Sequence, residues 1–185
     1  MKSVQRTSLA LTAVLFGILL AGRPAYAIST EGYSLFGTAA PTFLSSSSGN
    51  HNGVKLGGGI QFPAEPTERQ SIRVSTARIF DSGPWNRYNF LLHAAYRFIQ
   101  DFEAGVLIGV EYLDSAHSSG TYLKPLIGLE TLYTVKNFGA NSLSIVATYE
   151  VAQGSTGSIA LDGGPTDLSA NFFSIGLLFS FSVLR

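Results

Sequence analysis

Every second side chain between Arg87 and Leu113 is apolar, and this alternation constrains the fold more than any other feature of the chain. One set of alternate positions consists of Tyr88, Phe90, Leu92, Ala94, Tyr96 and Phe98, and after residues 99–101 it continues with Phe102, Ala104, Val106, Ile108, Val110 and Tyr112. The other set is polar or small at most positions: Arg87, Asn89, Leu91, His93, Ala95 and Arg97, then Glu103, Gly105, Leu107, Gly109, Glu111 and Leu113. Because successive side chains of a strand point to opposite faces, the segment predicts a long antiparallel hairpin with one apolar and one charged face.

The same alternation recurs along the chain and predicts eight strands. They span residues 33–43, 54–62, 71–80, 87–98, 102–113, 122–135, 142–151 and 169–184. One residue breaks the pattern, since Arg78 shares a face with the apolar Val74 and Phe80. We expect Arg78 near the outer interface of a membrane, or a β-bulge that shifts the register there.

The connectors favour an up-and-down order of strands. With an even strand count, residues 44–53, 81–86, 114–121 and 153–167 connect one end, and residues 63–70, 99–101 and 136–141 connect the other. The first set is longer and richer in Gly and Ser, which is typical of external loops in outer-membrane barrels with short periplasmic turns.

The amino terminus has the three parts of a secretory signal peptide. Positive Lys2 and Arg6 precede a 13-residue apolar run from Leu9 to Ala21, and Ala25-Tyr26-Ala27 provides a cleavage site. The alternative, a membrane anchor helix, needs about 20 apolar residues. We therefore predict a signal peptide at residues 1–27 and one domain at residues 28–185, exported from the cytoplasm.

Composition narrows the class further. Charged residues make up 13% of the chain, about half the share of roughly 25% in soluble domains. Past the predicted cleavage site, nine basic residues stand against twelve acidic ones, so there is no basic stripe for nucleic acid. The chain has no Cys, which excludes disulfides and a lipoprotein anchor, and no motif implies a cofactor.

Side-chain size predicts which face of the barrel points outward. Eight strands enclose a lumen that side chains just fill. The charged face carries the small residues, among them Gly57, Gly59, Gly105, Gly109, Gly128 and Ser174, whereas the other face carries Phe, Tyr, Leu and Ile. The bulky apolar face is too large for such a lumen, so we expect it to contact lipid. The fold class predicted is an all-β, eight-stranded antiparallel transmembrane β-barrel.

The inward charges predict a network of ion pairs in the lumen, because buried charges need partners. Its expected members are Arg87, His93, Arg97, Glu103, Glu111, Lys124, Glu130 and Glu150, with Lys55 and Arg73 on the same face. The hairpin register places Arg97 opposite Glu103, Asn89 opposite Glu111 and Phe98 opposite Phe102. We expect this network to plug the barrel.

The signal peptide, the eight alternating segments and the aromatic last strand together resemble the small OmpA/OmpX-type outer-membrane barrels across residues 28–185. The resemblance implies a Gram-negative bacterial outer membrane as the location. It also implies outer-membrane lipid and lipopolysaccharide as surroundings, and the barrel-assembly machinery as a partner during insertion.

A second, partial resemblance concerns chemistry. His117-Ser118-Ser119 resembles the His-x-Ser of the eight-stranded lipid A deacylase barrels, which use Ser, His and Glu. It implies His117 as base, Ser119 as nucleophile and Glu130 as the orienting acid. The alternative is that residues 114–121 are a polar external loop and Glu130 a lumenal charge. For His93, a hydrogen-bonded lumenal histidine is favoured over a metal ligand, and no metal site is predicted.

Three functional classes follow from these patterns. The first is a non-enzymatic barrel that stabilises the membrane or binds external partners through its loops. The second is a lipid-modifying enzyme of the outer leaflet, which a Ser119→Ala substitution would expose through altered lipid A acylation. The third is a narrow, porin-like channel, which needs a continuous water path along the lumen.

Overall fold

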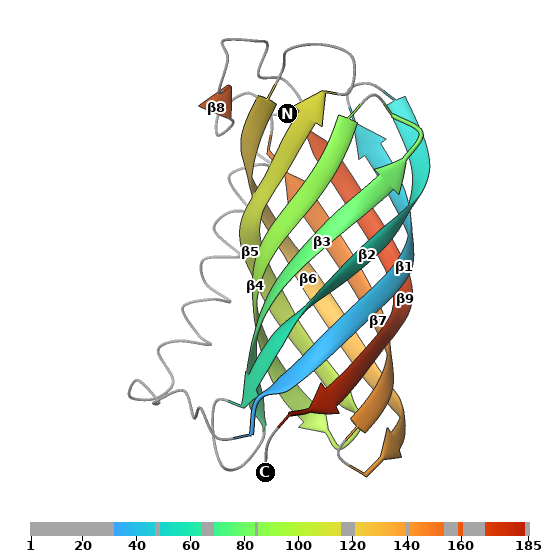
Figure 1. The fold of residues 1–185 in the computed structure, drawn as a ribbon, viewed down its shortest axis with the longest axis vertical. Coiled ribbons are helices and arrows are strands. Elements are labelled where there is room, and N and C mark those ends of the chain that lie inside the picture. The colour runs from blue at the N-terminus through green and yellow to red at the C-terminus, as the bar shows by residue number, and fades with distance from the viewer. Residues whose placement is uncertain are drawn as a thin grey trace.

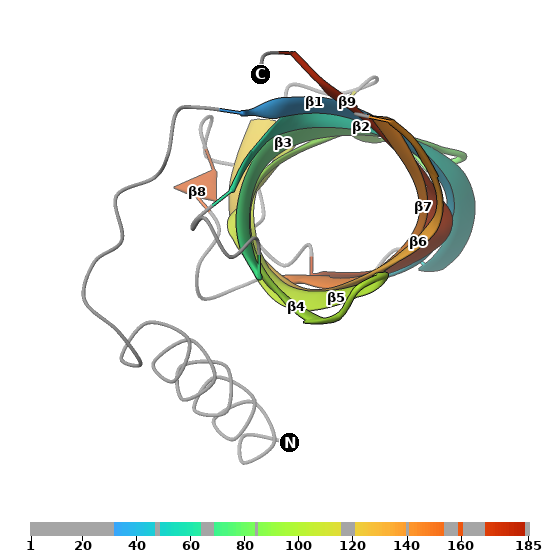
Figure 2. The same cartoon turned by 90° about the horizontal axis from the view of Figure 1, so that it is seen from below.

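A computed structural model describes residues 32–46, 49–63, 69–83, 85–115, 121–139, 141–153, 159–160 and 169–183. These residues form a closed antiparallel barrel of eight long strands (Figures 1 and 2). The strands are β1 (Ser34–Ser46), β2 (Gly49–Pro63), β3 (Gln70–Asp81), β4 (Trp85–Ile99), β5 (Phe102–Ser115), β6 (Thr121–Phe138), β7 (Asn141–Ala152) and β9 (Ala170–Ser182). Among the described residues, no helix has the length and apolar character needed to cross a bilayer.

Each long strand pairs with the next one along the chain, and β1 pairs with β9 to close the ring. We call the end of the barrel where Ser34 of β1 pairs with Ser182 of β9 the inner end. We call the opposite end, where Ser46 pairs with Gly49, the outer end. A short strand, β8 (Ile159–Ala160), pairs with the start of β6 at that outer end (Figure 1). The predicted eight-stranded up-and-down barrel is confirmed.

The predicted facing of the strands is also confirmed. The bulky apolar set points out of the barrel, with Phe90 51% and Phe179 43% exposed. The charged set points into the lumen, where Glu111 and Glu150 have no exposed surface. The alternation of the sequence therefore maps directly onto the two sides of the barrel wall.

Several predicted details of the connections are wrong. The expected turn 136–141 contains the end of β6, and the expected loop 153–167 contains β8. Residues 44–53 were expected to form a loop, but β1 and β2 stay paired as far as Ser46 and Gly49. The strands continue because their hydrogen bonds are made by the backbone, and polar and glycine residues form these bonds as well as apolar ones do. Leu44 also packs inside the lumen, at 2% exposure.

A further difference lies at the inner turn of the β4–β5 hairpin. Phe98 was expected opposite Phe102, but Ile99 takes that place because a β-bulge interrupts the register between Arg97 and Ile99. The extra residue leaves the Phe98 and Phe102 ring centroids 6.3 Å apart. The other predicted pairs, Arg97 with Glu103 and Asn89 with Glu111, are confirmed.

Arg78 lies on the outward face, three residues before the outer end of β3. The register of β3 with β2 and with β4 runs through Arg78 without a shift, so no bulge accommodates it. Its guanidinium lies 4.5 Å from the Phe80 ring centroid and 5.3 Å from that of Tyr88. Cation–π contact with two aromatic rings thus accounts for this exception to the apolar face.

Apolar side chains share the lumen with the charges, in two clusters. The larger cluster belongs to the outer half and consists of Leu44, Ile79, Leu91, Leu107, Leu126, Ala152, Ala170 and Phe172. The smaller one lies toward the inner end and consists of Phe36, Leu132, Val146 and Leu178. The larger cluster contacts the charges directly, since the Arg87 guanidinium lies 5.8 Å from the Phe172 ring centroid.

Candidate functional site

The lumen contains a network of ion pairs between described residues. Five cations and five carboxylates point into it: Lys55, Arg73, Arg87, Arg97 and Lys124 with Asp81, Glu103, Glu111, Glu130 and Glu150. Each of the ten takes part in at least one ion pair, so the formal charges cancel. The pairs fall into an outer, a middle and an inner cluster.

The outer cluster is centred on Arg87 of β4. Its Nε lies 3.0 Å from Asp81 Oδ2 and its Nη1 lies 2.8 Å from Glu111 Oε1. The other oxygen of Glu111 lies 3.1 Å from Lys124 Nζ. Sequence reasoning assigned Asp81 to a turn and so missed it as a partner of Arg87. Asp81 lies an even number of residues after Arg73 on β3 and therefore faces inward as well.

The middle cluster is centred on Glu150 of β7. Lys55 of β2 forms an ion pair with Oε1 of this carboxylate. Asn89 Nδ2 donates to Oε2 at 2.9 Å and Thr148 Oγ1 donates to Oε1 at 3.0 Å. Side chains from three strands thus bind one fully buried carboxylate through an ion pair and charge-assisted hydrogen bonds.

The inner cluster is centred on Arg73 of β3. This guanidinium forms an ion pair with Glu130, and its Nη1 lies 3.3 Å from Glu103 Oε2. Glu103 also accepts from Arg97 Nη2 at 2.7 Å and from Ser71 Oγ at 3.4 Å. Arg97 is partly exposed, so the cluster extends from the buried interior of the barrel to its inner end.

His93 connects Ser75 with Glu130. Ser75 Oγ lies 2.8 Å from His93 Nε2, and Glu130 Oε2 lies 3.2 Å from Nδ1 of the same ring. This order of groups is the one that activates a serine nucleophile. However, the cavity beside Ser75 and His93 has a volume of about 40 Å³, which is room for water and not for an ester substrate.

The predicted catalytic residues are only partly described. His117 and Ser119 lie outside the described residues, and Glu130 lies in the lumen, where it contacts Arg73 and His93. Within the described part of the chain, no group of three or more potential metal ligands comes together.

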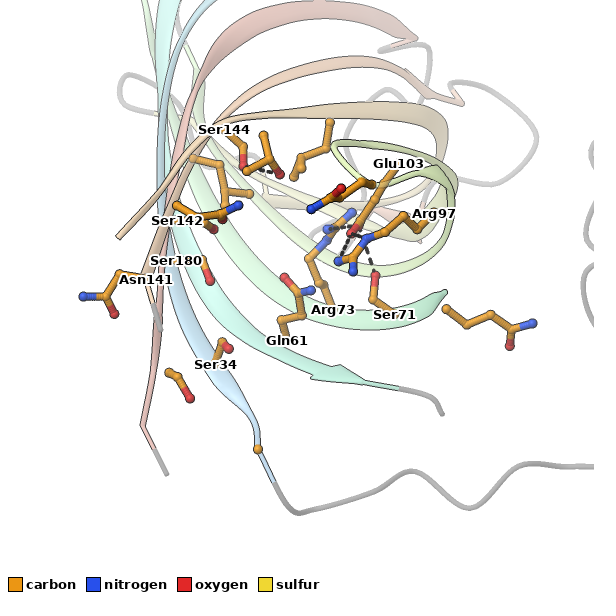
Figure 3. Close-up of a pocket in the computed structure, with 18 of the residues that line it drawn as sticks. Ser34, Gln61, Ser71, Arg73, Arg97, Glu103, Asn141, Ser142, Ser144 and Ser180 are labelled. Carbon is orange, nitrogen blue, oxygen red and sulfur yellow. Dashed lines mark hydrogen bonds and ion pairs between the residues drawn. The ribbon is translucent and has the colours of Figure 1, made fainter. Parts of the chain in front are cut away.

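A lumenal cavity opens at the inner end of the barrel (Figure 3). We call it the inner cup; its volume is about 540 Å³, and Gln61, Ser71, Arg73, Ser142, Ser144 and Ser180 are among its lining residues. Sequence reasoning missed it. The signal that could have predicted it is that the inward-facing positions at the inner ends of β7 and β9 are mostly serine.

No protein-family model matches the sequence, and no curated protein matches it. Among solved structures, Neisserial surface protein A (NspA) is similar with a TM-score of 0.58 and 15% identity, over 79% of this chain and 95% of that one. Ail, the attachment invasion locus protein of Yersinia pestis, is similar with a TM-score of 0.52 and 15% identity, over 82% of this chain and all of the other. At such identities the likeness shows the fold, which is that of the small eight-stranded outer-membrane β-barrels, as the resemblance of the sequence predicted.

Proposed function

We propose that this protein is an integral barrel of the bacterial outer membrane with a closed lumen and a structural or surface-interaction role. The observation that carries the proposal is the inside-out distribution of side chains, with Phe90, Leu177 and Phe179 exposed on the outer wall while the ionic groups are buried. In water such a wall would be an apolar surface far beyond the few hundred Å² usual for soluble monomers. In a bilayer it matches the acyl chains.

The closed lumen is supported by its packing. Leu107, Leu126 and Phe172 are at most 1% exposed in the outer half, beside an ion-paired Glu111 with no exposed surface. An ion crossing this region would have to displace both the apolar cluster and the paired charges. Burial of an unpaired charge in such a medium costs several kcal/mol or more.

Recording across planar bilayers tests the closed lumen. The purified barrel is expected to show no steady unitary conductance, and a Phe172→Gly substitution is expected to introduce brief openings. A stable conductance in the unsubstituted protein would contradict the closed lumen and favour a narrow channel. Fractionation of bacterial membranes tests the location separately, and recovery in the soluble or inner-membrane fraction would contradict it.

Outer-membrane lipid and lipopolysaccharide are the proposed surroundings, and Arg78 supports this. Its guanidinium faces outward near the outer end, in contact with the rings of Phe80 and Tyr88, where phosphate groups of the outer leaflet would lie. An Arg on the lipid face costs about 2–4 kcal/mol at mid-membrane and little at the interface. Replacing Arg78 by Gln should therefore weaken retention of lipopolysaccharide by the purified barrel, with Thr76→Ser as the outward control on the same strand.

During insertion, we propose that the barrel-assembly machinery acts on β9. The outward parity of this strand is apolar from Phe173 to Phe181. The external partner, if the role is surface interaction, would meet the connectors at the outer end of the barrel. Deletion of residues 153–167 should abolish such an interaction while the barrel still folds, because the long strands lie outside the deleted range.

A further inference from the structure

We propose that the inner cup is a binding site for a neutral, polyhydroxylated ligand the size of a mono- or disaccharide. The orientation of the cup toward the periplasm rests on the proposed outer-membrane location, whereas the binding itself does not. The cup is a single cavity of about 540 Å³ that opens at the inner end of the barrel. Typical small-ligand pockets have volumes of about 300–1,000 Å³.

The walls of the cup carry hydroxyl and amide groups from several strands. Gln61 belongs to β2, Ser71 to β3, Ser142 and Ser144 to β7, and Ser180 to β9 (Figure 3). A serine hydroxyl both donates and accepts, and a glutamine side chain offers two donors and an acceptor. A ring of such groups matches a polyol, whose hydroxyls also donate and accept in every direction.

The charges around the cup balance one another and do not favour a charged ligand. Arg73 and Arg97 carry two positive charges, and they are paired with Glu103 and Glu130, which carry two negative charges. An anionic ligand would have to compete with these carboxylates for the guanidinium groups. The local balance therefore favours a neutral ligand over a phosphate or carboxylate.

The floor of the cup provides an apolar patch. Leu132 and Leu178, at 5% and 2% exposure, line the cavity beside Arg73. A sugar matches an apolar floor beneath polar walls, because one face of its ring is C–H and its edge carries oxygens.

The test uses the whole barrel in detergent micelles and isothermal titration with three probes: maltose and N,N′-diacetylchitobiose as neutral disaccharides, and glucose 6-phosphate as an anionic sugar. We expect saturable binding of at least one neutral disaccharide and weaker binding of the phosphate. Ser180→Leu and Gln61→Leu narrow the cup from β9 and β2, the two strands that flank β1, and should each weaken binding about tenfold, or about 1.4 kcal/mol. Ile60→Leu, on the outward face next to Gln61, should leave it unchanged.

Three results would overturn the site: no saturable heat with any neutral sugar, equal affinity in the two cup variants, or tightest binding of the phosphate. Circular dichroism establishes that each variant is folded, and either cup variant alone suffices if the other does not fold. The channel recordings and membrane fractionation above test the proposed function independently. Loss of sugar binding would leave that proposal intact, and a barrel found elsewhere in the cell could still bind the sugar.

Discussion

The outer half of the lumen and the inner cup are built by the same alternation of inward and outward residues, yet they differ in what fills them. The outer half holds large apolar side chains and ion pairs without exposed surface, such as Leu107, Phe172 and Glu111. The cup holds serines and amides around a cavity of about 540 Å³. Because an eight-stranded lumen is just wide enough for side chains to fill, their volume decides whether a given depth is packed or open.

This difference separates two roles within one barrel. Closure and stability are expected to depend on the outer half, where each removed group leaves a void or an unpaired charge. Access of a ligand depends on the cup, where water can replace a removed group. Matched pairs of substitutions, within and between these regions, test this division of roles.

The largest effect is expected from Glu111→Gln in the outer cluster. Arg87 would lose one of two carboxylates and Lys124 would lose Glu111, both in a region without exposed surface. Breaking such a buried pair costs about 3–5 kcal/mol. Urea unfolding in lipid vesicles, followed by the fluorescence of Trp85, the only tryptophan of the chain, measures the loss in free energy of unfolding.

The matched substitution at the inner end is Glu103→Gln. Arg97 is 33% exposed there and Arg73 keeps its ion pair with Glu130, so solvent and a second carboxylate compensate. The loss should be less than half that of Glu111→Gln. Adding Lys124→Met to Glu111→Gln should restore part of the outer loss. Equal losses at the two ends, or no restoration, would contradict the proposed boundary.

The next effect concerns packing, and two adjacent phenylalanines of β9 provide the comparison. Phe172 fills the outer half with no exposed surface, whereas Phe173 faces outward at 44% exposure. Phe172→Ala should cost about 3 kcal/mol, because it leaves a cavity in a closed interior. Phe173→Ala should cost clearly less, since lipid can fill the space. The same urea titration compares them, and a larger loss for Phe173→Ala would show that the lumen is loosely packed.

A smaller effect is expected where strands approach closely in the outer half. A Cβ added to Gly109 would overlap the backbone carbonyl oxygen of Phe90 and come within 3.1 Å of Leu91 Cα. Gly109→Ala should therefore cost about 2 kcal/mol, a typical cost of overpacking. In Gly37→Ala, near the inner end and on the outward face of β1, the new atom would meet nothing closer than 3.9 Å, so the thermal midpoint should hardly move. A shift of equal size in both variants would rule out close packing as the cause.

The sequence predicted the wall of the barrel well because facing is a local property. Period-two alternation is preserved whatever the strand tilt, so the inward position of Glu130 and the outward position of Phe179 could be predicted without coordinates. Strand ends were less predictable. Backbone ladders extend through polar residues such as Asn50 and Asn52, whose side chains resemble those of loops.

The interior of the barrel could be predicted only in part. Pairs across a hairpin, such as Arg97 with Glu103, follow from the register of neighbouring strands. Pairs across the lumen, such as Lys55 with Glu150, depend on strand tilt and shear, which set the depth of each residue. The inner cup was missed for the same reason, because the sequence does not say which inward serines lie at the same depth.

The smallest effects are expected in the cup, and two serines of β7 locate its floor. Ser142 lines the open part of the cup and is half-buried, whereas Ser144 lies deeper, is 1% exposed and donates to Thr134 Oγ1 at 3.3 Å. Ser142→Ala should change the free energy of unfolding by less than about 0.5 kcal/mol, because water replaces its hydroxyl. Ser144→Ala should cost about 1 kcal/mol, because it removes a buried hydroxyl and leaves the half-buried Thr134 hydroxyl without its donor. If both are neutral, water reaches below Ser144, and the boundary between the open and the packed lumen lies nearer to Val146.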